Sequence, residues 1–132
     1  PALDRLFFGS LGNGAFEISG GICRQICVRM PPAEGPVAVA SASHRDAQTN
    51  QWLEKRGVTN SIAIGSSLKF CLIAAGEADL YPRYGPTMEW DTAAGDAVLR
   101  AAGGRVMAED GKPFPYGKAG YRNEPFFAAG GG

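Results

Sequence analysis

Short apolar runs alternate with segments of helical periodicity along most of this chain. The strands predicted from Val37 onward lie at 37–41, 61–65, 78–81 and 105–107, and the predicted helices lie at 46–56, 66–76 and 91–102. This alternation is typical of an α/β fold, in which helices and sheets pack as layers. Pro82 is expected to end the third strand. The helix at 66–76 is apolar on nearly all sides, so we expect it to lie between two layers.

Antiparallel strands are predicted at both ends of the chain. Apolar runs at 6–8 and 15–18 flank a Gly/Asn turn and predict a hairpin, and 25–28 predicts a third strand. The hairpin is expected to make the sheet mixed. Residues 108–124 read as a loop, and 126–128 as a final edge strand.

Composition limits what the chain can bind. Its 132 residues suit one domain, predicted over 1–128, with a flexible Gly-rich tail at 129–132. Thirteen basic and thirteen acidic residues cancel, which argues against nucleic-acid binding but permits a small basic pocket. No apolar run approaches the roughly eighteen residues of a membrane span. The three cysteines are predicted to be buried, reduced thiols, which favours a cytoplasmic location.

The start of the helix at 91–102 is the strongest candidate for chemistry. Asp91 can cap this helix, or Thr92 can do so instead, which would leave the amides of Ala93, Ala94 and Gly95 unpaired. Such a helix end attracts phosphate, and a carboxylate beside it can hold a metal ion on that phosphate. An ordinary capped packing helix is the alternative, and spacing alone favours it.

Two cations are candidates for binding a phosphate. Ser66 and Lys69 are three residues apart at a helix start and therefore share a face. The alternative is a plain helix cap with a solvated lysine. Arg83 lies in a loop stiffened by Pro82 and Pro86, and a guanidinium can grip phosphate through two parallel hydrogen bonds. The alternative is a surface arginine.

Four further side chains are considered for this site. His44 is the only histidine and follows a buried strand, at the kind of strand end where α/β proteins bind ligands. Trp90 is predicted to be a packing anchor that fixes Asp91, rather than a base-stacking platform. Glu89 is expected to lie in a loop that can reach the pocket, and Asp96 is expected to face water.

These residues resemble a known family. Trp90-Asp91 with Ala93-Ala94-Gly95 and an apolar helix ending in Gly103-Gly104 resemble a signature of the inositol monophosphatase superfamily of metal-dependent phosphatases. The segments 41–44, 65–72 and 78–86 are similar to one branch, the 3′(2′),5′-bisphosphate nucleotidases. The resemblance covers nearly the whole chain.

The resemblance implies a fold and an activity. The fold is a layered α-β-α-β-α arrangement of the sugar-phosphatase type. The activity is Mg²⁺-dependent, lithium-sensitive removal of the 3′-phosphate from adenosine 3′,5′-bisphosphate. By resemblance, Asp91 binds the metal, and Ser66, Lys69, Arg83 and His44 bind the nucleotide. Hydrolysis of an inositol or sugar monophosphate, and a non-catalytic nucleotide- or phosphate-binding fragment, are the alternatives.

One family signature does not occur in this chain. Relatives carry Asp-Pro-(Ile/Leu)-Asp-Gly-Thr with a preceding glutamate, and those residues supply most of the metal ligands, but no such run is present here. We therefore expect the chain to be the C-terminal half of the phosphatase domain. The missing N-terminal half is its expected partner, and the chain alone is expected to be inactive. A homodimer, and association with the inner face of a membrane, are open alternatives.

Overall fold

The computed structural model describes residues 4–41, 47–65 and 67–131. The chain begins with a separate three-stranded antiparallel sheet made of β1 (Arg5–Ser10), β2 (Gly14–Ser19) and β3 (Ile22–Ile26). The predicted hairpin is therefore confirmed, and a third strand follows it, but at 22–26 rather than at the predicted 25–28. Because alternate residues of a strand face opposite sides, Ala15 and Glu17 are buried while their neighbours are more exposed.

A five-stranded sheet forms the centre of the molecule. Its strands lie in the order β5 (Asn60–Ala63), β4 (Val37–Ala40), β6 (Leu80–Arg83), β10 (Phe126–Ala129) and β8 (Arg105–Ala108). β4 is parallel to β5 and β6, whereas β10 is antiparallel to both of its neighbours, β6 and β8. The sheet is mixed as predicted, but β10 makes it so, because the hairpin belongs to the other sheet.

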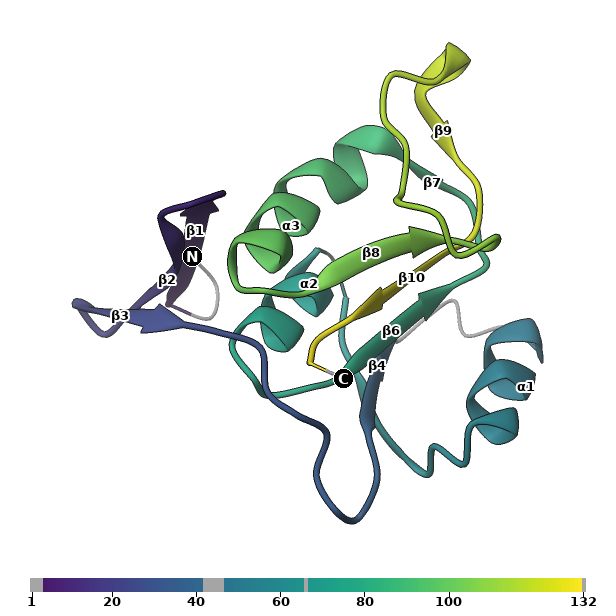
Figure 1. The fold of residues 1–132 in the computed structure, drawn as a ribbon, viewed down its shortest axis with the longest axis horizontal. Helices are drawn as coiled ribbons and strands as arrows, with labels where there is room; N and C mark the ends of the chain where they lie inside the picture. The colour runs from purple at the N-terminus through teal and green to yellow at the C-terminus, as the bar shows by residue number, and fades with distance from the viewer. Residues whose placement is uncertain (1–3, 42–46, 66, 132) are drawn as a thin grey trace.

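In the described residues, three α-helices complete the α/β fold, and Figure 1 shows how they lie relative to the sheets. α2 (Leu68–Ala74) and α3 (Glu89–Ala101) lie between the two sheets, and α1 (Ala47–Lys55) lies on the far side of the central sheet. The layers thus run sheet, helices, sheet, helix. This order corresponds to four consecutive layers of the predicted α-β-α-β-α arrangement.

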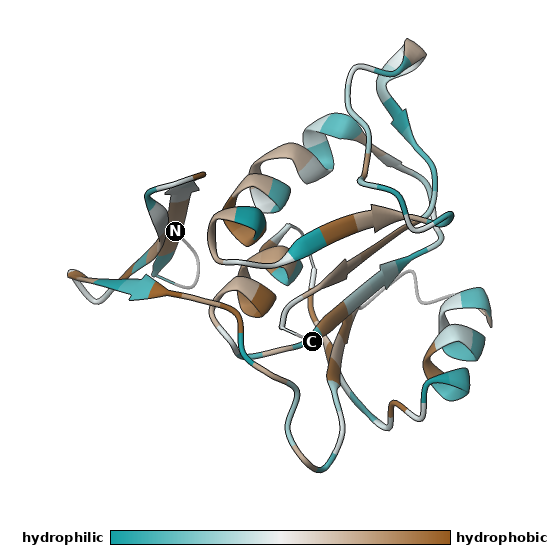
Figure 2. Cartoon of the chain, in the orientation of Figure 1, coloured by the Kyte–Doolittle hydropathy of each residue, from teal (hydrophilic) through white to brown (hydrophobic). Residues whose placement is uncertain are grey.

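The core lies where α2 and α3 meet the central sheet, and the helix faces turned toward it are apolar (Figure 2). The ring of Phe70 stacks on Phe126 at 5.7 Å and meets the edge of Tyr81 at 5.2 Å. Gly95 brings the two helices close together, because a Cβ at this position would lie 2.5 Å from Phe70 Cδ2. This close approach places the second turn of α3 beside the first turn of α2.

Several predicted boundaries were wrong. β10 was predicted to be an edge strand but is internal, and Phe126 is fully buried. Pro82 lies within β6 rather than ending it, paired opposite Phe127. The segment 108–124 is not entirely loop, because β9 (Arg122–Asn123) pairs with β7 (Thr87–Met88) and a 3₁₀ turn, η1, covers Ala119–Tyr121.

The tail and the thiols also differ from expectation. Ala129 belongs to β10, Gly130 N–H donates to Asp79 O at 3.0 Å, and Gly131 N–H donates to Arg29 O at 3.1 Å, so these residues are held in place. Cys23 and Cys27 are free and exposed rather than buried. Within the described ranges, none of the helices has the length and hydrophobicity needed to cross a membrane.

Candidate active site

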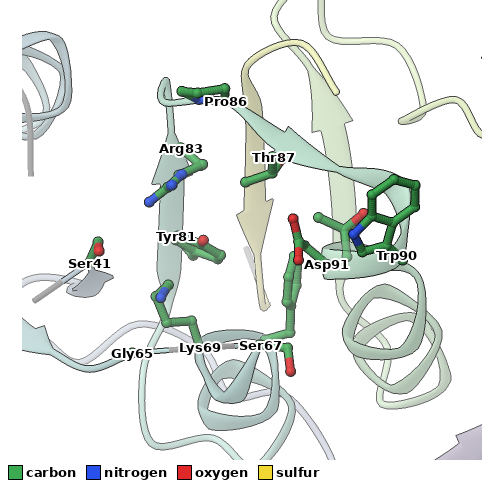
Figure 3. A pocket seen from close by; sticks show the side chains of 12 residues that line it. Ser41, Gly65, Ser67, Lys69, Tyr81, Arg83, Pro86, Thr87, Trp90 and Asp91 are labelled. Atoms are coloured by element: carbon green, nitrogen blue, oxygen red, sulfur yellow. The ribbon is translucent and has the colours of Figure 1, made fainter. Parts of the chain in front are cut away.

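A pocket of about 490 Å³ opens where β4, β6, the start of α2 and the first turn of α3 converge. Figure 3 shows Lys69 and Arg83 on one side of this pocket, and Asp91 and Trp90 on the other. Its lining also includes Ser41, Gly65, Ser67, Tyr81, Thr87 and Thr92. Three of the residues predicted from the sequence, from three different elements, therefore share one cavity.

Asp91 caps α3 in a way that the sequence did not predict. The helix begins at Glu89 after an extended Met88, so Asp91 is its third residue. Asp91 Oδ2 accepts the Met88 N–H at 2.9 Å, which pairs a backbone group just outside the helix. The helix starts two residues early, so the amides of Ala93, Ala94 and Gly95 lie inside it and are not a free phosphate site.

The Asp91 carboxylate can still serve a ligand. Its side chain is exposed to the pocket, and its contact to Met88 engages Oδ2, which leaves Oδ1 available for a cation. Mg²⁺ takes about six oxygen ligands. The part of the chain that the structure describes holds no cluster of three His, Cys, Asp or Glu side chains that could bind a metal. Among the described residues, Asp91 therefore does not form such a site together with two other side chains of these types.

Lys69 is buried rather than solvated, contrary to the alternative reading of the sequence. Only 4% of its surface is exposed, and its Nζ donates to Ile64 O at 3.1 Å and lies 5.3 Å from the centre of the Tyr81 ring. Burial lowers the Lys69 pKa, and the nearby Arg83 charge lowers it further. A buried cation next to a second cation favours an anionic ligand.

Arg83 ends β6 with its guanidinium in the same pocket. Among the described residues, its Nε is a buried donor without a hydrogen-bond partner. A buried, unpaired donor of this kind costs stability unless a ligand satisfies it. Arg83 is thus a pocket residue and not a surface arginine.

Two predicted binding residues, Ser66 and His44, lie outside the described residues. Their neighbours Gly65, Ser67 and Ser41 line the pocket. Ser67 was considered the less likely contact from the sequence, because it matches no binding position that the resemblance supplies.

The neighbours of Asp91 do not behave as predicted. Trp90 is 68% exposed and lines the pocket, so it is not a buried packing anchor. Glu89 is in the helix, and its carboxylate accepts the N–H groups of Gly117 and Lys118 at 3.0 and 2.9 Å. Asp96 is buried instead of facing water, and it accepts the Arg100 Nε–H at 2.7 Å.

A polar network behind Asp91 was not predicted at all. The buried Thr92 hydroxyl donates to Glu89 O and accepts from Tyr116 and Asn123, each at 3.2 Å. Asn123 Nδ2 also donates to the Thr87 hydroxyl at 3.1 Å. These contacts fasten β7, β9 and the preceding loop to the first turn of α3. No local pattern signals the contacts of Tyr116 and Asn123, because their partners are more than twenty residues away.

Comparison with known protein families matches residues 1–127 to the inositol monophosphatase family. The chain belongs to that family. The match begins at the first residue and ends within β10, so it covers the three described helices and all strands before β10.

Individual relatives show which proteins of the inositol monophosphatase family this chain is similar to. The 3′(2′),5′-bisphosphate nucleotidase CysQ of Escherichia coli is 46% identical over 116 residues, and that of Buchnera aphidicola is 39% identical over 132. These alignments cover 88% and 98% of this chain but 46% and 49% of those proteins. The crystal structure of CysQ from Bacteroides thetaiotaomicron superposes with a TM-score of 0.87 and 36% identity, covering 98% of this chain and 55% of that one. The chain thus spans about half the length of its relatives.

Proposed function

We propose that this chain is part of a phosphatase that removes the 3′-phosphate from adenosine 3′,5′-bisphosphate, yielding AMP and phosphate. The observation that carries the proposal is the pocket itself, in which buried Lys69 and Arg83 lie across from the Asp91 carboxylate, and Arg83 Nε has no hydrogen-bond partner among the described residues. Similarity to proteins named 3′(2′),5′-bisphosphate nucleotidase supports the choice of substrate.

The two sides of the pocket suit a substrate with two phosphates. Lys69 and Arg83 offer charged donors to the phosphate that is retained, and a guanidinium can form paired hydrogen bonds with it. Asp91 lies opposite, where a cation would hold the phosphate that is cleaved. A monophosphate would leave one of these two sides unused. Ser66 and His44 are proposed as further nucleotide contacts.

We propose Mg²⁺ as the cofactor, with Asp91 as one of its ligands. The bound metal would activate a water molecule and neutralise charge on the phosphoryl oxygens. A single carboxylate cannot hold Mg²⁺ alone, so the remaining oxygens are proposed to come from the part of the relatives that this chain does not span. The chain by itself is therefore expected to bind the nucleotide but not to hydrolyse it. A homodimer and a cytoplasmic location stay predictions.

The test compares this chain with a protein that spans the full length of the relatives. Phosphate release from adenosine 3′,5′-bisphosphate is measured with Mg²⁺, and then with lithium added. We expect release from the longer protein alone, suppressed by lithium and reduced at least about 100-fold by Asp91→Asn, because the neutral amide is a poor cation ligand.

Two results would contradict the proposal. Cleavage of inositol monophosphate in preference to the nucleotide would assign the pocket to a different substrate of the same family. Nucleotide binding without phosphate release from either protein would leave only a binding function.

A further inference from the structure

Two exposed aromatic rings lie beside one another, and one of them lines the pocket. Trp90 is 68% exposed and lines the pocket, and Tyr121 is 56% exposed. Their ring centres are 6.4 Å apart and their planes are tilted by 51°. Such large apolar surfaces are normally buried, so an exposed aromatic pair beside a polar pocket indicates a binding surface.

The backbone at Tyr121 is held in an unfavourable conformation. Its φ is +55°, in the left-handed region that residues with a side chain rarely adopt, and it follows Gly120 at φ +72°. Packing does not explain this conformation, because more than half of the Tyr121 side chain is exposed. Strain that the core does not require is typical of functional positions.

Contacts on both sides of Tyr121 maintain this conformation. On one side, the Glu89 carboxylate accepts the backbone N–H of Gly117 and of Lys118 and pairs with the Lys118 ammonium at 2.8 Å. On the other side, buried Asn123 donates to the hydroxyls of Thr87 and Thr92. Both anchors reach the first turn of α3 or the strand before it, next to Trp90. Tyr121 is thus fixed relative to Trp90.

We propose that Trp90 and Tyr121 bind the base of the nucleotide and so determine specificity for nucleoside bisphosphates over bisphosphates without a base. This inference rests on the function proposed above, and it adds which residues read the base. The cations Lys69 and Arg83 lie across the pocket from Trp90, so a ligand with phosphate at one end and a flat ring at the other matches both sides. Stacking tolerates any base, because every base has a π-face.

Fluorescence gives a direct readout of this contact. The chain has two tryptophans, and Trp52→Phe would leave Trp90 as the only one while keeping a ring stacked on Phe127. Adenosine 3′,5′-bisphosphate is then titrated into this variant, with inositol 1,4-bisphosphate as the ligand without a base. We expect strong quenching of Trp90 by the nucleotide and little by the inositol compound.

Affinity measurements identify the energetic role of the ring. Measured by calorimetry, Trp90→Leu is expected to lower the affinity for adenosine 3′,5′-bisphosphate about tenfold or more, as expected for the loss of one base–aromatic stack. Binding of inositol 1,4-bisphosphate should change less than about twofold. Phe8→Leu is the matched control, because Phe8 is an exposed aromatic residue on the three-stranded sheet. It should change neither affinity.

The outcomes separate this inference from the proposed function. Suppose that the nucleotide binds and that Lys69→Met lowers its affinity, but that Trp90→Leu leaves the affinity unchanged. The pocket is then the nucleotide site, and the assignment of Trp90 to the base is overturned. If Trp90→Leu weakens both ligands equally, the ring supports the phosphate site and does not select the base. If neither ligand binds the unaltered chain, the proposed function fails, and this inference fails with it.

Discussion

Lys69 carries a charge that destabilises the fold but that can bind an anionic ligand. Its ammonium is almost fully buried, with one hydrogen bond to Ile64 O and with Arg83 as a neighbouring like charge. Because the pKa of the folded state is lowered, the unfolded chain binds the proton more tightly. The resulting penalty is present at neutral pH and is relieved as the pH rises through the lowered pKa toward the ordinary value.

Replacing this charge should therefore leave the fold intact while damaging the pocket. Lys69→Met keeps the length of the side chain and removes the desolvated charge, so we expect an unchanged or higher melting temperature at pH 7. Affinity for adenosine 3′,5′-bisphosphate should fall at least about tenfold, as for loss of a charged hydrogen bond. Lys55→Met, an exposed lysine of α1, is the control and should change neither. A large drop in melting temperature with full binding would mean that Lys69 is purely structural.

At the scale of elements, the first turn of α3 organises its surroundings through Glu89. The carboxylate holds the loop at Gly117 and Lys118, and these contacts lower the Glu89 pKa from 4.5 to about 2, chiefly through the Lys118 side chain and backbone. A lowered acid pKa means that the charged form stabilises the fold. That contribution is fully present above pH 4.5 and is lost as the pH falls toward 2.

Glu89→Gln should reveal this contribution through its dependence on pH. At pH 7 we expect a melting temperature lower by roughly 5 °C, because the loop loses a charged acceptor. The difference from the unaltered protein should shrink between pH 4.5 and pH 2 as its own Glu89 becomes protonated. Glu124→Gln, at an exposed position of the same region, is the control, and its difference in melting temperature from the unaltered protein should not shrink in this way. A difference that stays constant with pH would exclude the carboxylate charge as the cause.

The same elements show how far the sequence could predict this structure. Periodicity located all three helices and most strands, because apolar spacing reports which face is buried. It could not tell that β10 is internal, since three apolar residues do not reveal which strands flank them. β7 and β9 are two residues each and have no periodicity to detect. The resemblance predicted Asp91, Lys69 and Arg83 as site residues, and these three do line one pocket. The role of Glu89 could not be predicted, because its carboxylate binds a loop that lies 28 residues further along the chain.

At the scale of the whole molecule, the outer face formed by β1 and β2 in the three-stranded sheet is apolar. Leu6 is 59% exposed and Phe8 44%, and they pair across β1 and β2 with Ile18 and Phe16. An antiparallel sheet with one solvated face normally carries polar residues there. The chain spans about half the length of its relatives, so this face is available for contact with further polypeptide.

We therefore expect the 132-residue chain to self-associate through this face. Sedimentation should show a larger species whose fraction rises with protein concentration. Leu6→Lys should raise the dissociation constant of this association at least about tenfold, because it places a charge in the apolar contact. Leu11→Lys makes the same chemical change at the more exposed hairpin turn, where Leu11 is 73% exposed. It should leave the association unchanged. If both variants dissociate equally, net charge rather than the sheet face controls association, and if the unaltered chain stays monomeric at every concentration, this face does not bind a second copy.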